Sequence, residues 1–121
     1  MTTHVDITDA EIASRVFRLL GLGVRSRGAV VGVKQVREAA RRNTLQFAVV
    51  ATDASVNSRD KIVPLLQARR VNFMEVPSAA ALGAAVGRDQ TAVVGIIDRQ
   101  LAAGVRALAS TSRSRTGQED V

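Results

Sequence analysis

The stretch GLGVRSRGAV contains the spacing G-x-x-x-x-G, between Gly23 and Gly28, with which phosphate-binding P-loops begin. A P-loop continues with Lys and then Ser or Thr, because the lysine reaches the β- and γ-phosphates and the hydroxyl binds magnesium. In this chain Ala29 and Val30 follow the second glycine. The stretch also has a predicted helix before it and a predicted strand after it, whereas a P-loop needs the reverse order. We therefore exclude a nucleotide site here.

Other residues that could carry catalysis are few. The chain has no cysteine, which excludes disulfides, thiolate zinc sites and thiol nucleophiles. Its one histidine, His4, lies in a short segment near the N-terminus that we interpret as a loose leader. Asp53 follows an apolar run, where α/β folds often place catalytic carboxylates. No second carboxylate accompanies it and a helix follows, so we assign Asp53 a structural role. The sequence predicts no catalytic residue, no metal site and no cofactor.

Basic residues are concentrated in one part of the chain. The net charge is +6, and residues 15–42 hold eight basic side chains but one acid, Glu38. Such a block indicates either a polyanionic partner or a solvated surface. The chain has three Phe and no Tyr or Trp, which argues against a base-stacking platform of the RRM or OB type. The eight basic residues are Arg15, Arg18, Arg25, Arg27, Lys34, Arg37, Arg41 and Arg42.

Within this block, Gly32 is predicted to begin a helix. The free N–H groups and the dipole of a helix start favour a phosphate. Lys34 and Gln35 lie in the first turn, where they add a charge and an amide. Arg37 and Arg41 are four residues apart on one face, and they repel each other unless an anion covers them. Glu38 lies on the same face and partly neutralises the charge of these two arginines.

Hydrophobic periodicity predicts five helices and four strands in alternation, which implies a three-layer α/β sandwich. The strands are nearly all apolar, as in a sheet that is covered on both faces. We expect helices at about 9–20, 33–43 and 58–69, from Ser78 to Gly87 and from Asp98 to Ala109, and strands at 29–31, 45–51, 71–76 and 91–97.

The helix ends follow from capping residues. Thr8, with Glu11, fits a capping box for the first helix, and Gly21 and Gly23 are expected to end it. Asn57 or Ser58 is expected to cap the third helix, Ser78 the fourth and Asp98 the fifth. We expect one domain over residues 9–109, a loose leader at 1–8 and a disordered tail at 110–121.

The short fourth helix contains Gly83 and ends at Gly87. Glycine inside a helix costs roughly 1 kcal/mol relative to alanine, so Gly83 indicates close packing. Gly87 is followed by the polar loop Arg88-Asp89-Gln90, which leads into a predicted strand.

Four segments together resemble the bacterial branch of the kink-turn RNA-binding superfamily of L-seven-Ae and L-thirty-e ribosomal proteins. They are LLGLGVRSRGAVVG, VKQVREAARRN leading into FAVVATDAS, VPSAAALGAAVGRDQ and AVVGIID, and they cover roughly residues 12–108. The resemblance implies a three-layer α/β/α sandwich with a mixed, about four-stranded sheet. It also implies RNA binding through the start of the second helix and the loop after the fourth.

In the family, the second helix opens Gly-x-Asn-Glu, and a lysine follows three residues later. This chain keeps Gly32 but has Lys34, Gln35 and Glu38 at the other positions. Gln35 can donate and accept at a guanine edge and Lys34 can reach a phosphate, whereas Glu38 would repel one. In the second loop, the resemblance implies a phosphate contact for Arg88 and packing of residues 86–87 near an extruded base. The predicted RNA-binding residues are Arg25, Arg27, Gly32, Lys34, Gln35, Arg37, Glu38, Arg41, Val86, Gly87, Arg88, Asp89 and Gln90.

The sequence thus predicts a non-catalytic RNA-binding protein of ribosomal-protein type that recognises structured, kink-turn-like RNA. Ribosomal RNA is one candidate partner. No apolar run approaches the roughly 20 residues of a membrane span, so we expect a cytoplasmic monomer without a membrane partner.

Two alternative functions stay open. Some relatives of this fold bind proteins, so the chain could be a protein-interaction module with weak or no RNA binding. Related domains also capture RNA for fused methyltransferases, a role that this chain could fill only in trans.

Overall fold

Helices and strands alternate between residues 7 and 120, in the predicted order. The computed structural model describes the backbone of residues 7–120 and the side chains of residues 10–110. Within that part of the chain the elements are α1 (Ile7–Arg25), β1 (Ala29–Val31), α2 (Val33–Arg41), β2 (Phe47–Ala51), α3 (Val56–Ala68), β3 (Phe73–Val76), α4 (Ala79–Ala85), β4 (Val93–Ile96) and α5 (Arg99–Asp120).

The strands form one mixed sheet in the order β1-β4-β2-β3. β4 runs antiparallel to both β1 and β2, whereas β2 and β3 are parallel. Every residue of β2 and of β4 is buried, because these two strands occupy the middle of a sheet with helices on both faces. The predicted three-layer α/β/α sandwich with a four-stranded mixed sheet is confirmed.

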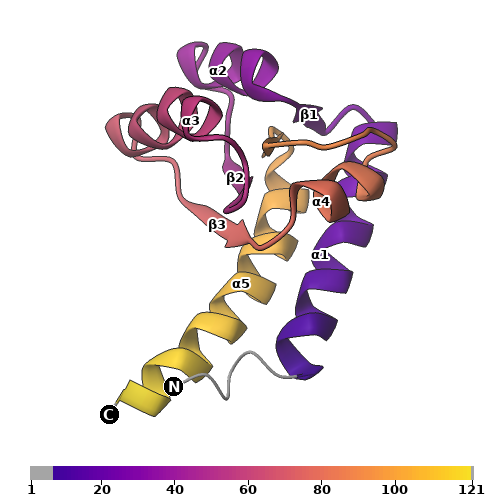
Figure 1. Ribbon diagram of the computed structural model, residues 1–121, viewed down its shortest axis with the longest axis vertical. Coiled ribbons are helices and arrows are strands. Elements are labelled where there is room, and N and C mark those ends of the chain that lie inside the picture. The colour runs from indigo at the N-terminus through magenta and orange to yellow at the C-terminus, as the bar shows by residue number, and fades with distance from the viewer. Residues whose placement is uncertain (1–6, 121) are drawn as a thin grey trace.

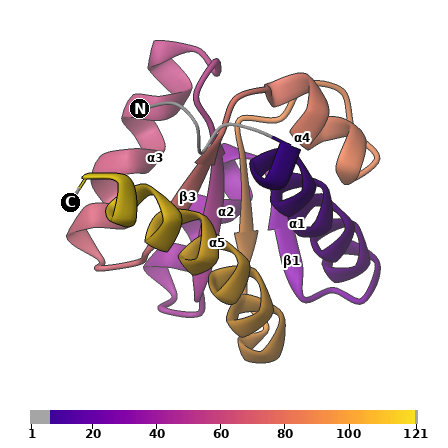
Figure 2. The ribbon, with the colours of Figure 1, turned by 90° about the horizontal axis from the view of Figure 1, so that it is seen from below.

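Two hydrophobic cores lie on opposite faces of the sheet. α1, α4 and α5 cover one face, and α2 and α3 cover the other (Figures 1 and 2). Successive side chains of a strand point to opposite faces, so Phe47 and Val49 of β2 enter the first core and Ala48 and Val50 enter the second. The continuous apolar run of β2 therefore supplies both cores at once.

The first helix extends beyond its predicted end, because Gly21 and Gly23 lie inside it and do not end it. A Cβ at Gly21 would lie 2.7 Å from the carbonyl oxygen of Ala85, and a Cβ at Gly23 would overlap the side chain of Leu101. The two glycines let α1 approach α4 and α5 closely. The prediction that these glycines end the helix was wrong. In a sequence, a glycine can indicate either the end of a helix or a place where another element packs closely against the helix.

α1 ends at Arg25, and the turn after it has no glycine in the left-handed position. Arg27 has a φ of 65°, in the left-handed region. Its N–H donates to the carbonyl of Val24 at 3.2 Å, and the N–H of Gly28 donates to the carbonyl of Gly23 at 2.7 Å. These two bonds form a Schellman motif, which usually has glycine in the left-handed position.

Most other boundaries agree with the predictions to within two residues. α1 already includes Ile7, so Thr8 lies within the helix and does not precede it as a cap. Ser55 caps α3, in place of Asn57 or Ser58, because its backbone is still extended and its Oγ accepts from the N–H of Ser58 at 3.1 Å.

The two ends of the chain are described only in part. α5 continues to Asp120, past the predicted end at Ala109. The predicted disorder of residues 110–121 stays a prediction. His4 and most of the predicted leader lie outside the described residues.

Asp53 has the structural role that the sequence predicts. Its Oδ1 accepts a hydrogen bond from the backbone N–H of Ala79 at 2.7 Å, at the start of α4. Ser78 caps the same helix, with its Oγ accepting from the N–H of Ala81 at 3.0 Å. The two side chains satisfy two of the N–H groups that a helix start leaves without partners, and Asp53 also ties the β2–α3 turn to α4.

Replacing Asp53 tests this role. We expect Asp53→Ala to destabilise the protein by about 1 kcal/mol, because the N–H of Ala79 loses its acceptor. Asp53→Asn keeps an acceptor oxygen and should change the melting temperature much less. Equal losses in the two variants, measured by thermal denaturation, would show that the carboxylate charge matters and not the cap.

Candidate nucleic-acid interface

The two predicted contact segments, the start of α2 and the loop after α4, lie at the same end of the sheet. The N–H of Gly32 donates to the carbonyl of Val93, the first residue of β4, at 2.9 Å. The loop of residues 86–90 leads into that strand. The last residue of β2, Ala51, donates its N–H to the carbonyl of Ala92 at 2.8 Å. The sheet thus brings these two segments together.

The start of α2 is open and has no side-chain cap. Gly32 has a φ of 95°, which disfavours any other residue, and nothing lies within 4 Å of the position of a Cβ there. No side chain in the described part of the chain bonds the first N–H groups, and the first turn holds no acid. Lys34 and Gln35 are exposed beside it. Free N–H groups, a helix dipole and a lysine together favour an anion at this point.

The loop after α4 is held in shape by backbone bonds. The N–H of Arg88 donates to the carbonyl of Gly83 at 2.8 Å, and Gly87, with a φ of 74°, donates to Ala84 at 3.3 Å. Gly83 packs directly on the loop, because a Cβ there would overlap the carbonyl oxygen of Asp89. The close packing predicted for Gly83 is confirmed.

The residues of this loop differ in exposure. Gly87, Arg88, Asp89 and Gln90 are exposed. Val86 is 8% exposed and belongs to the core beneath α1, α4 and α5. The part of the loop that can reach a ligand from the surface is therefore residues 87–90.

A small pocket, which the sequence does not predict, adjoins the loop. Its volume is about 210 Å³, and hydroxyl and amide side chains line it together with alanines. It lies where the β2–α3 turn, the start of α4 and the end of the loop meet. The lining residues are Ala54, Ser55, Ser58, Ala79, Gln90, Thr91 and Ala92.

The charged face of α2 is partly committed to contacts within the protein. Glu38 Oε2 lies 2.9 Å from Arg42 Nε, so an arginine compensates the charge that was expected to repel phosphate. Arg37 Nη1 donates to the carbonyl of Lys61 on α3 at 2.6 Å. Arg41 is exposed.

Arg25 and Arg27, at the end of α1 and in the turn before β1, lie apart from Gly32. Arg25 and Arg27 precede β1, and the three residues of that strand separate them from the start of α2. A Cβ added at Gly21 would lie 3.7 Å from Arg25 Nη1 and 2.7 Å from the carbonyl oxygen of Ala85. The guanidinium of Arg25 therefore lies near the end of α4. The turn that contains Arg27 packs near the start of α5, since Gly28 accepts there from Asp98 at 3.1 Å.

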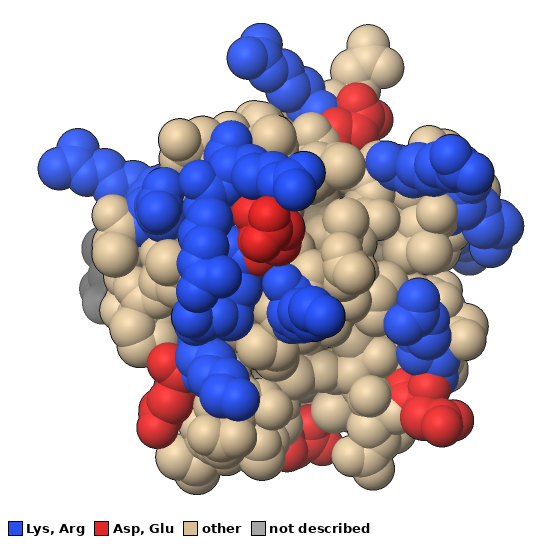
Figure 3. Space-filling view, turned by 90° about the horizontal axis from the view of Figure 1, so that it is seen from above, with Lys and Arg blue, Asp and Glu red and all other residues tan. Residues whose placement is uncertain are grey.

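The surface at the α2 end of the molecule is strongly basic. Lys and Arg side chains form a band across this face, with acidic atoms inside it (Figure 3). Among the described residues, no three His, Cys, Asp or Glu side chains are grouped as a metal site would need. None of the described helices has the length and apolarity that crossing a membrane requires.

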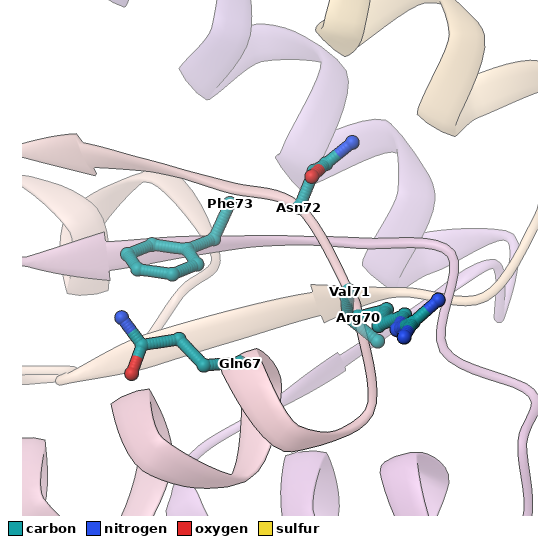
Figure 4. Close-up of a pocket in the computed structure, with 5 residues that line it drawn as sticks. All are labelled: Gln67, Arg70, Val71, Asn72 and Phe73. Carbon is teal, nitrogen blue, oxygen red and sulfur yellow. The ribbon is translucent and has the colours of Figure 1, made fainter.

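A second hollow lies at the other end of the sheet, where α3 ends and β3 begins. Its volume is about 390 Å³. Arg70 and Val71 lie on one side of it, and Gln67 and Phe73 lie on the other (Figure 4). None of the predicted RNA-binding residues lines it.

Comparison with known proteins agrees with this fold. The chain is 31% identical over 86 residues to the "RNA-binding protein YlxQ" of Bacillus subtilis (strain 168), which covers 71% of this chain and 86% of that protein. A solved structure of a Bacillus halodurans C protein with unknown function has a TM-score of 0.70 and 25% identity, and the match covers 77% of this chain and 94% of that one. The Giardia lamblia 15.5kD RNA binding protein shares the fold, with a TM-score of 0.72 at 19% identity, over 86% of this chain and 89% of that one.

The match to a family of proteins leaves out only residues 7–13 of α1 and residues 106–120 of α5 among the described helices and strands. Residues 14–105 match the model of the Ribosomal protein L7Ae/L30e/S12e/Gadd45 family, and the chain belongs to this family.

Proposed function

We propose that this chain is a non-catalytic, monomeric RNA-binding protein that recognises structured, kink-turn-like RNA. The contact surface is the end of the sheet where α2 begins and α4 ends. The observation that carries the proposal is the uncapped start of α2, with Lys34 and Gln35 exposed beside the loop of residues 87–90. The 31% identity to a protein described as RNA-binding supports it.

The site suits recognition of RNA shape. Backbone N–H groups at the start of α2 and Lys34 would hold phosphates, which position the RNA. Gln35 would bond a base edge, and the pocket beside Gln90 offers hydroxyl and amide groups to a base that a kink or bulge has unstacked. Arg25, Arg41 and Arg88 would add phosphate contacts around this centre.

A titration of the protein with a kink-turn RNA and with a plain duplex of equal length tests the proposal. The kinked RNA should bind more tightly, and the log–log slope of affinity against salt should be about −3 to −5 if roughly 4–6 phosphates are neutralised. Equal binding of the two RNAs would contradict kink-turn recognition. If the protein bound neither of these RNAs and no ribosomal RNA fragment, the whole proposal would be contradicted. Self-association that does not depend on salt would then favour a protein-interaction module.

A further inference from the structure

A groove lies between α2 and α3, next to the start of α2. Its volume is about 440 Å³, and the residues that line it are Val33, Lys34, Arg37 and Lys61. Three of these four residues are cationic, and no acid lines the groove. Val33 is the first residue of α2, so the groove adjoins the uncapped helix start.

The cations of this groove are positioned but not neutralised. Arg37 is held by its 2.6 Å bond to the carbonyl of Lys61, which uses one of the five N–H donors of its guanidinium. Lys34 and Lys61 are exposed and form no ion pair with any described residue. Of the nearby acids, Glu38 is paired with Arg42, and Asp60 does not line the groove.

Cations gathered in a hollow without a carboxylate repel one another, and an anion relieves that repulsion. A phosphate fits the groove chemically, because it can accept hydrogen bonds from a guanidinium and two ammonium groups at once. Lys61 comes from α3, whereas the residues predicted from the sequence lie on α2 and in the loop after α4. Only the packing of α2 on α3 places Lys61 beside Lys34.

We propose that the α2–α3 groove binds a backbone phosphate of the RNA, and that Lys61 is one of the residues that contact it. This inference rests on the proposed function, since the phosphate belongs to the same RNA that occupies the start of α2. RNA would then run from the loop after α4, over the start of α2, and along the seam between α2 and α3.

The substitution Lys61→Gln tests the groove, with the kink-turn RNA titrated at several salt concentrations. Loss of one phosphate contact should reduce the magnitude of the salt slope by about 0.9 and weaken binding several-fold at low salt. Lys61→Arg keeps the charge and should bind nearly as tightly as the unchanged protein. Melting curves of both variants should match the unchanged protein, because the Lys61 side chain is exposed.

Arg70→Gln is the matched control, because it removes one exposed positive charge at the far hollow (Figure 4). It should leave the salt slope unchanged. Equal effects of Lys61→Gln and Arg70→Gln, or an unchanged slope in Lys61→Gln, would overturn the groove proposal while RNA binding stands. If the unchanged protein bound no RNA, the proposed function itself would be wrong.

Discussion

The substitution Gly83→Ala is expected to destabilise the protein by at least about 2 kcal/mol and to lower the melting temperature by roughly 10 °C or more. The added Cβ would overlap the carbonyl oxygen of Asp89 and lie 3.1 Å from that of Arg88. Both obstacles are backbone atoms, so no change of rotamer removes the overlap. Either α4 or the loop of residues 87–90 must move, and RNA affinity should fall with the displaced loop. Thermal denaturation and an RNA titration below the melting temperature measure the two effects.

Gly104→Ala is the control for this prediction. Gly104 also lies inside a helix, but a Cβ there would meet only Leu19 Cδ1, at an ordinary 3.6 Å. Alanine should therefore stabilise α5 by about 0.5–1 kcal/mol. If Gly83→Ala melted at the same temperature as Gly104→Ala, the close packing of α4 on its loop would not contribute to stability.

The substitution Lys34→Glu is expected to weaken RNA binding at least about 10-fold at low salt, because it replaces a phosphate contact with a like charge. The same change should stabilise the free protein slightly, by about 0.3–1 kcal/mol, since a carboxylate is favourable in the first turn of a helix. Opposite changes in affinity and stability distinguish a binding residue from a structural one. An RNA titration and a melting curve of the same variant measure both.

Arg70→Glu makes the same change of net charge at the other end of the sheet. It should reduce RNA affinity much less than Lys34→Glu does. Equal losses would mean that RNA responds to the total charge of the protein and not to the start of α2.

The order of the elements and the layers of the fold could be predicted from the sequence because they follow from local patterns. The run Phe47–Ala51 is apolar at every position, which indicates a central strand before any partner is known. The end of α1 could not be predicted in this way. Gly21 and Gly23 face Ala85 and Leu101, which lie more than 60 residues away in the sequence, so only the folded chain shows their role.

The candidate site divides in the same way. Gly32 and the loop after α4 carry local signals, and the structure brings them to one end of the sheet. The pairing of Glu38 with Arg42 follows i,i+4 spacing and could have been read from the sequence. The role of Lys61 could not be predicted from the sequence, because its place beside Lys34 depends on how α2 packs against α3.

In the proposed complex, RNA contacts the end of the sheet where α2 begins. Backbone amide chemical shifts of the protein, recorded while a kink-turn RNA is added, test this most directly. We expect the largest changes at residues 32–37 and 87–91, with little change along the outer surfaces of α1 and α5. Saturation of the protein with RNA without changes at the start of α2, or with changes confined to α1 and α5, would contradict it.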